Sequence, residues 1–74
     1  MKTMTVSVVV NPVDDGYVSL CPELDITSQG DTIEEALANL KKALEGFLET
    51  ASEEEVRTRL KKPALFTRLE VECP

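Results

Sequence analysis

The chain has 74 residues, which is the size of one small domain, and we predict a single domain over residues 1–74. Asp and Glu number 14 against 8 Lys and Arg, and the net charge of −6 disfavours binding to phosphate-rich nucleic acid and favours a basic partner. No stretch approaches the ~20 apolar residues of a membrane span and no apolar leader is evident, so we expect a cytoplasmic protein without membrane contact.

The first third of the chain predicts a β-hairpin. Residues 4–10 alternate and are rich in valine, which is typical of a strand, and Pro12 is expected to end it because proline has no N–H for the ladder. Asp15-Gly16 is a strong hairpin signal, and residues 17–21 then form the returning strand up to Pro22. A third short strand over residues 26–29 completes an antiparallel meander.

A long amphipathic helix follows. We expect Gly30 to supply a backbone conformation that other residues adopt only at a cost. Thr32 is a good N-cap, and Glu35 three residues later predicts a capping box in which each residue bonds the backbone N–H of the other. The helix should run to about Thr50, with one apolar face made of Ile33, Leu37, Leu40, Leu44 and Phe47.

The last quarter of the chain predicts a short helix and a strand. Ser52 and Glu55 form a second capping box, and the helix that they open should lie on the surface and end near Lys61. Residues 65–71 alternate between an apolar and a charged side, which predicts a half-buried strand. The predicted fold is therefore a two-layer α+β domain of order β-β-β-α-β, in which one main helix covers one face of an open sheet. Its uncovered face and edge would suit the addition of another chain.

The residue types needed for catalysis are sparse. The chain has no histidine, so Ser19 and Ser28 have no base to activate them. Cys21 and Cys73 alone cannot hold zinc, and the carboxylates are spread over turns, helix entrances and the last predicted strand. We therefore expect no enzyme, no metal and no cofactor. A cytosolic setting keeps both thiols reduced, although a disulfide between the two cysteines is an alternative.

Two segments resemble the HicB antitoxin family. They are GYVSLCPEL at residues 16–24 and SQGDTIEEALANL at residues 28–40, which combine a strand, a turn and a capped helix in the family's order and spacing. The structural positions of this pattern are Gly16, Pro22, Gly30, Thr32 and Glu35. The resemblance implies a partial RNase H-like α+β fold without the catalytic carboxylates, and a domain that binds and neutralises HicA toxins, which are small basic ribonucleases that cleave mRNA.

The resemblance leaves the binding surface and the partner open. Many family members carry a C-terminal DNA-binding module, whereas this chain ends at Pro74 after the last predicted strand, so direct nucleic-acid binding is not expected. A homodimer or a higher homo-oligomer is expected, because so small a domain is marginal alone. The predicted partner contacts are the acidic turn and the charged side of the last strand: Glu23, Asp25, Arg68, Glu70 and Glu72. Alternatives are an orphan oligomeric scaffold without a toxin and a minimal metal-dependent RNase H-type nuclease.

Overall fold

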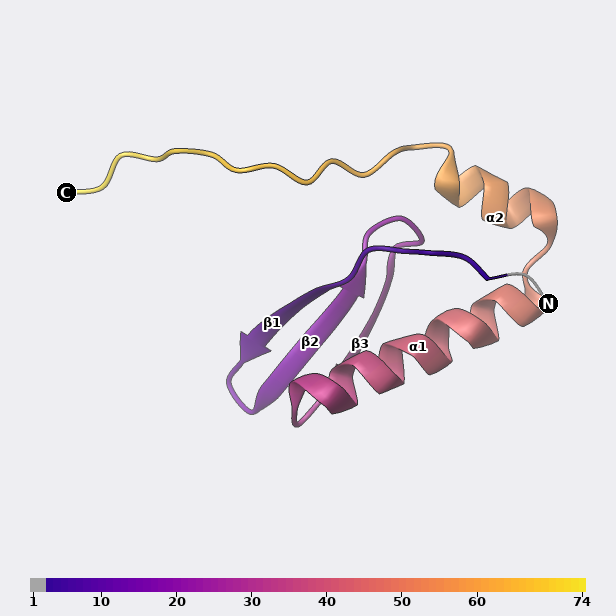
Figure 1. Ribbon diagram of the computed structural model, residues 1–74, viewed down its shortest axis with the longest axis horizontal. Helices are drawn as coiled ribbons and strands as arrows, with labels where there is room; N and C mark the ends of the chain where they lie inside the picture. Colours follow the sequence, from indigo (N-terminus) through magenta and orange to yellow (C-terminus); the bar gives the residue numbers. More distant parts are fainter. Residues whose placement is uncertain (1–2) are drawn as a thin grey trace.

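The computed structural model describes residues 3–74, and it contains three strands followed by two helices (Figure 1). Strands β1 (Val9–Val13), β2 (Gly16–Cys21) and β3 (Ile26–Gly30) form an antiparallel sheet in the order β1-β2-β3. Helix α1 (Ile33–Thr50) packs along the sheet, and the shorter α2 (Glu53–Leu60) follows it. The predicted α+β class and the three-stranded meander are confirmed. The first two positions of the predicted domain lie outside the described residues.

The β1–β2 hairpin forms where Asp15-Gly16 predicted it, with Val13 opposite Gly16 across the turn. The expectation that Pro12 ends the first strand is wrong, because Pro12 lies within β1 opposite Tyr17. An edge strand tolerates proline where the missing N–H would face away from its neighbour. Residues 4–8, which were predicted as part of the first strand, lie outside the sheet. The reason is that β2 ends at Cys21, so these residues have no opposing strand. The predicted end of β2 at Pro22 is confirmed.

The cap of α1 is confirmed with one change. The Glu35 backbone N–H donates to the Thr32 hydroxyl at 3.1 Å, as in the predicted capping box. The Glu35 carboxylate, however, accepts from the backbone N–H of Asp31 at 3.1 Å and not from that of Thr32. The side chain therefore closes the turn one residue earlier and ties the end of β3 to the first turn of the helix.

Gly30 is required for close packing rather than for an unusual backbone. Its φ is not positive, so the predicted reason for this glycine is wrong. A Cβ atom at Gly30 would lie 2.5 Å from the backbone nitrogen of Ala36 and 2.7 Å from the Cβ of Glu35, closer than real Cβ contacts allow. A Cβ atom at Gly16 would lie 2.5 Å from the carbonyl oxygen of Gly30. The two glycines therefore let β2, β3 and the start of α1 approach one another.

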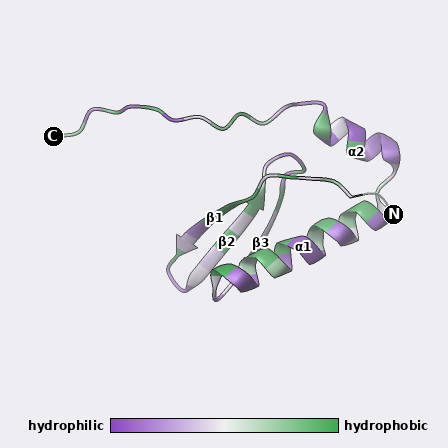
Figure 2. Ribbon diagram, in the orientation of Figure 1, coloured by the Kyte–Doolittle hydropathy of each residue, from purple (hydrophilic) through white to green (hydrophobic). Residues whose placement is uncertain are grey.

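The core is small and lies between α1 and the sheet. Its buried apolar side chains are Cys21, Leu24, Ala36, Leu40 and Leu44. Ser19 is fully buried among them and donates its hydroxyl to the carbonyl oxygen of Ala36 at 2.8 Å, which satisfies its polar atom. The sheet is narrow and covers only part of the predicted apolar face of α1. Ile33 and Leu37 consequently stay exposed, and Figure 2 shows apolar segments along the whole length of the helix.

Helix α2 lies on the surface, as predicted, and none of its residues is buried. The Ser52 hydroxyl accepts from the Glu55 N–H at 3.1 Å, which confirms the second helix cap. Arg59 anchors the helix, because its guanidinium donates to the carbonyl oxygen of Leu24 and lies 4.5 Å from the centroid of the Phe47 ring.

The predicted C-terminal strand is absent from the described part of the chain. Residues 63–74 have no regular secondary structure and extend away from α2 as a single yellow-orange segment (Figure 1). Leu65, Leu69 and Val71 are 83%, 85% and 80% exposed. Alternation of apolar and charged residues favours a strand only where a neighbouring strand supplies hydrogen bonds and a face to bury the apolar side. Among residues 3–74, this segment pairs with no strand and leaves its apolar side chains exposed.

Candidate protein-interaction surfaces

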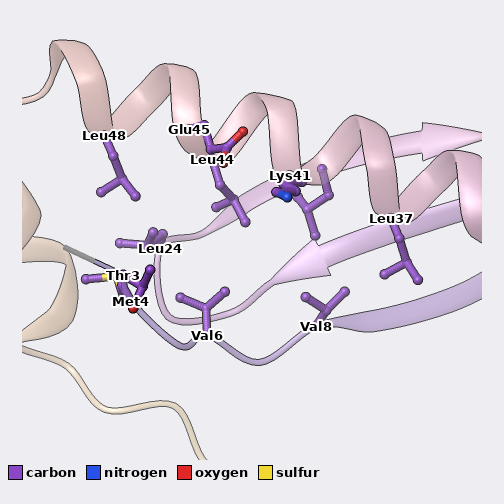
Figure 3. A pocket seen from close by; sticks show the side chains of 11 residues that line it. Thr3, Met4, Val6, Val8, Leu24, Leu37, Lys41, Leu44, Glu45 and Leu48 are labelled. Atoms are coloured by element: carbon purple, nitrogen blue, oxygen red, sulfur yellow. The ribbon is translucent and has the colours of Figure 1, made fainter. Parts of the chain in front are cut away.

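An apolar groove runs along α1, and its other wall is the extended segment of residues 3–8 (Figure 3). Its cavity volume is about 500 Å³. Leu37, Leu44 and Leu48 point into it from the helix, and Met4, Val6 and Val8 face them, with Leu24 at one end. We call this feature the apolar groove; its full lining is Thr3, Met4, Val6, Val8, Leu24, Leu37, Leu40, Lys41, Leu44, Glu45 and Leu48.

The apolar groove gathers a large part of the exposed apolar surface of the folded body. Met4, Val8, Leu37 and Leu48 are all exposed large apolar residues, and all four line it. Single exposed apolar residues are ordinary, but a contiguous patch beside polar residues marks an interaction surface. Lys41 and Glu45 supply charge of both signs within the lining. The groove is therefore suited to a partner that brings its own apolar side chains.

Glu23 fixes the wall of the groove that is formed by residues 3–8. Both of its carboxylate oxygens accept from the Ser7 backbone N–H, at 2.9 and 3.1 Å, and one also accepts from the Cys21 thiol at 3.6 Å. Its own backbone N–H, aided by Ser7, holds the pKa of Glu23 below its usual value. Burial raises the pKa of the Cys21 thiol. Glu23, predicted as a partner contact, thus makes contacts within its own chain.

A second hollow, which we call the acidic hollow, lies at the opposite end of the sheet from Glu23. Its cavity volume is about 470 Å³, and three carboxylate residues line it: Asp15 from the hairpin turn, Asp31 before α1 and Glu35 from the first turn of α1. The remaining lining is Val13, Gly16, Tyr17, Gln29, Gly30 and Asn39. The Asn39 side-chain amide donates to the carbonyl oxygen of Gln29 at 2.7 Å and ties this part of the helix to β3.

From the sequence, Asp15 was assigned to the hairpin turn and Asp31 and Glu35 to the helix entrance, and the acidic hollow that the three share was missed. The signal that could have found it is the pairing of β2 with β3. Tyr17 lies opposite Gly30, so the hairpin turn that precedes Tyr17 comes beside the helix entrance that follows Gly30. The concentration of negative charge there is a surface that would attract a basic group.

The other predicted contact residues are exposed. Asp25 occupies the turn between β2 and β3 with a φ of 54°, a left-handed conformation that aspartate tolerates better than most residues. Arg68, Glu70 and Glu72 lie on the C-terminal segment. Within residues 3–74, the side chains of these four residues form no hydrogen bond, and the Arg68 carbonyl oxygen accepts from the Thr67 hydroxyl at 3.5 Å. Whether they contact a partner stays a prediction.

Other features of the described residues bear on chemistry. Residues 3–74 contain no group of three or more His, Cys, Asp or Glu side chains placed to hold a metal ion. Both cysteines of this part of the chain are free, with Cys21 buried in the core and Cys73 exposed near the C-terminus. None of the helices described here has the length and apolar character that crossing a membrane requires.

Comparison with known proteins gives one informative relative. No family model and no solved structure matches the sequence. The UPF0150 protein ssl0738 of Synechocystis sp. (strain ATCC 27184 / PCC 6803 / Kazusa) is 36% identical over 66 residues, which are 88% of this chain and 90% of that protein. The similarity thus covers most of the length of both chains. At this identity and coverage, the chain belongs to the UPF0150 family.

Proposed function

We propose that this UPF0150 protein is a non-catalytic, HicB-like antitoxin domain that binds and neutralises a small, basic, HicA-type ribonuclease in the cytoplasm. The first support is the resemblance of residues 16–24 and 28–40 to the HicB pattern, whose strand, turn and capped helix are formed by β2, β3 and α1. The second is the net charge of −6, which favours a basic partner over a nucleic acid.

The acidic hollow is the observation that carries this proposal. The segments with the HicB pattern border it, and they bring Asp31 and Glu35 next to Asp15 of the hairpin turn. A ribonuclease that binds RNA presents positive charge around its active site, because it must contact phosphates. An acidic concavity of this kind would speed the encounter with such a surface and cover it once bound.

Isothermal titration calorimetry with a purified HicA-type ribonuclease tests the proposal. The double variant Asp15→Asn/Asp31→Asn should weaken binding by about tenfold or more, which corresponds to about 1.4 kcal/mol. The matched control, Glu53→Gln/Glu54→Gln on α2, removes the same charge away from the acidic hollow and should bind as the natural chain does. Absence of binding by the folded natural chain would refute the proposal, and equal weakening by both variants would move the interface away from the hollow.

The apolar groove favours a second candidate function, a homo-oligomeric HicB-like scaffold that binds no toxin. A scaffold of this kind would associate through apolar contacts, so its assembly should persist at high salt, where the charge-driven binding of a ribonuclease weakens. Calorimetry separates the two. A scaffold of this kind gives no heat of binding with the ribonuclease, whereas dilution of the chain alone at high ionic strength should still show its self-association.

A further inference from the structure

The C-terminal segment and the apolar groove are two uncovered surfaces of one small protein. The apolar side chains of residues 65–71 are among the most exposed of the described chain. The backbone of this segment forms no backbone–backbone hydrogen bond within residues 3–74. The radius of gyration is 14.5 Å, whereas a compact chain of this length would have about 11 Å. The difference arises because the segment projects from the body (Figure 1).

The segment of residues 3–8 offers an unpaired strand edge beside the groove. The Ser7 N–H is taken by the Glu23 carboxylate on one side. Successive peptide groups of an extended chain point to opposite edges, so the N–H groups of Val6 and Val8 point to the other side. Among the described residues, neither of these two N–H groups has a backbone partner. Met4, Val6 and Val8 all turn their side chains into the groove, so a strand added at this edge would face α1 with one of its sides.

The C-terminal segment matches that edge in pattern and in length. Leu65, Leu69 and Val71 share one side of an extended chain, while Arg68 and Glu70 share the other. Residues 65–71 span about 20 Å at ~3.3 Å per residue. The helical wall of the groove from Leu37 to Leu48 spans about 17 Å at ~1.5 Å per residue. One such segment would therefore cover the groove along most of its length.

We propose that the C-terminal segment of a second copy of the chain adds as an edge strand beside residues 3–8 and lays Leu65, Leu69 and Val71 in the apolar groove, and that the exchange is reciprocal. The two copies then bury both uncovered surfaces at once and satisfy the backbone groups of both unpaired segments. This inference does not rest on the proposed antitoxin function.

The anchoring of α2 favours a second copy over the same chain as the source of the strand. Arg59 holds α2 through the Leu24 carbonyl and the Phe47 ring, which fixes where the C-terminal segment starts. Pro63 then restricts its own φ and biases Lys62 towards an extended conformation, so the connection is short and stiff. From this start the segment leaves the body and does not enter its own groove (Figure 1).

Sedimentation equilibrium of the full chain gives the first test. The natural chain should have the molar mass of a dimer, and both Leu65→Asp/Leu69→Asp in the segment and Leu37→Asp in the groove should lower it to that of a monomer. Leu60→Asp is the control, because this exposed leucine lies on α2 outside both surfaces, and it should remain dimeric. An equimolar mixture of the segment variant and the groove variant should recover dimers, since one of the two exchanged contacts is intact. A monomeric natural chain, or a dimer that survives both variants, would overturn the proposal.

A paramagnetic label on the exposed Cys73 gives the second test, while the buried Cys21 is protected. The first sample mixes two forms of the chain. One form carries the spin label and no ¹⁵N, and the other carries ¹⁵N and no spin label. Exchange predicts broadening of the amide signals around Met4 and Leu37 of the ¹⁵N chain. In the second sample, a chain that carries both the spin label and ¹⁵N is diluted into an excess of natural chain. The amide signals around Met4 and Leu37 should then sharpen, because the groove of the ¹⁵N chain holds a segment without a spin label. Broadening confined to the labelled chain itself would show docking within one chain and would overturn the proposal.

Discussion

Replacing Gly30 by alanine tests whether this glycine serves close packing, and Gly46 provides a control with the same chemical change. The Cβ of Gly30→Ala would lie 2.5 Å from the Ala36 nitrogen, against backbone that cannot move without shifting the start of α1. Overpacking of this kind costs about 1–3 kcal/mol, and the smaller entropy of the unfolded alanine chain offsets about 0.4–1 kcal/mol of that. A net loss of about 1–2 kcal/mol is expected.

Gly46→Ala should act in the opposite direction. Gly46 is an exposed helical residue, and nothing lies within 4 Å of the Cβ that alanine would add. Alanine in a helix interior is favoured over glycine by about 0.5–1 kcal/mol, so this variant should be more stable. Urea unfolding followed by circular dichroism measures both, and in thermal unfolding each kcal/mol moves the midpoint by about 4–8 °C. Equal stabilisation by both substitutions would refute the packing account of Gly30.

Further substitutions test other contacts, each by the same unfolding measurements. Leu24 is fully buried, so Leu24→Ala should lower the free energy of unfolding by about 2–5 kcal/mol. This is a large part of the about 4–11 kcal/mol expected for a domain of this length. A loss below about 1 kcal/mol would argue against the described core. Thr32→Ala removes the cap of α1 and should lower the free energy of unfolding by about 1 kcal/mol. Ser52→Ala should lower it by less, because α2 buries no residue. The reverse order would contradict the assignment of α1 as the core helix. The pKa of Glu23 is lowered in the folded chain, so its contribution is present above the unfolded pKa of ~4.3 and is lost as the pH falls through the lower folded pKa. Glu23→Gln should therefore flatten the fall of the thermal midpoint below about pH 4, and an unchanged pH profile would contradict the role of Glu23.

Local signals predicted the part of the fold that local interactions form. The turn at Asp15-Gly16 and the caps at Thr32 and Ser52 depend on neighbours within a few residues, and all three were located from the sequence. The reason for Gly30 was wrong because it depends on how closely α1 approaches β3, which no local pattern contains.

The C-terminal segment shows the limit of a periodic pattern. Residues 65–71 have the alternation of a half-buried strand, but a strand needs a partner, and the sequence does not say whether that partner belongs to the same chain. The candidate sites were missed for a related reason. Asp15 and Asp31 meet because β2 pairs with β3, and the groove exists because the narrow sheet leaves part of α1 uncovered.

Cleavage of mRNA by a purified HicA-type ribonuclease, measured against increasing concentrations of the chain, is the decisive test of the proposed antitoxin function. Cleavage should fall to the background level as the chain approaches equimolar amounts, and the double variant Asp15→Asn/Asp31→Asn should require a higher concentration for the same inhibition. Undiminished cleavage in the presence of excess folded chain would contradict it.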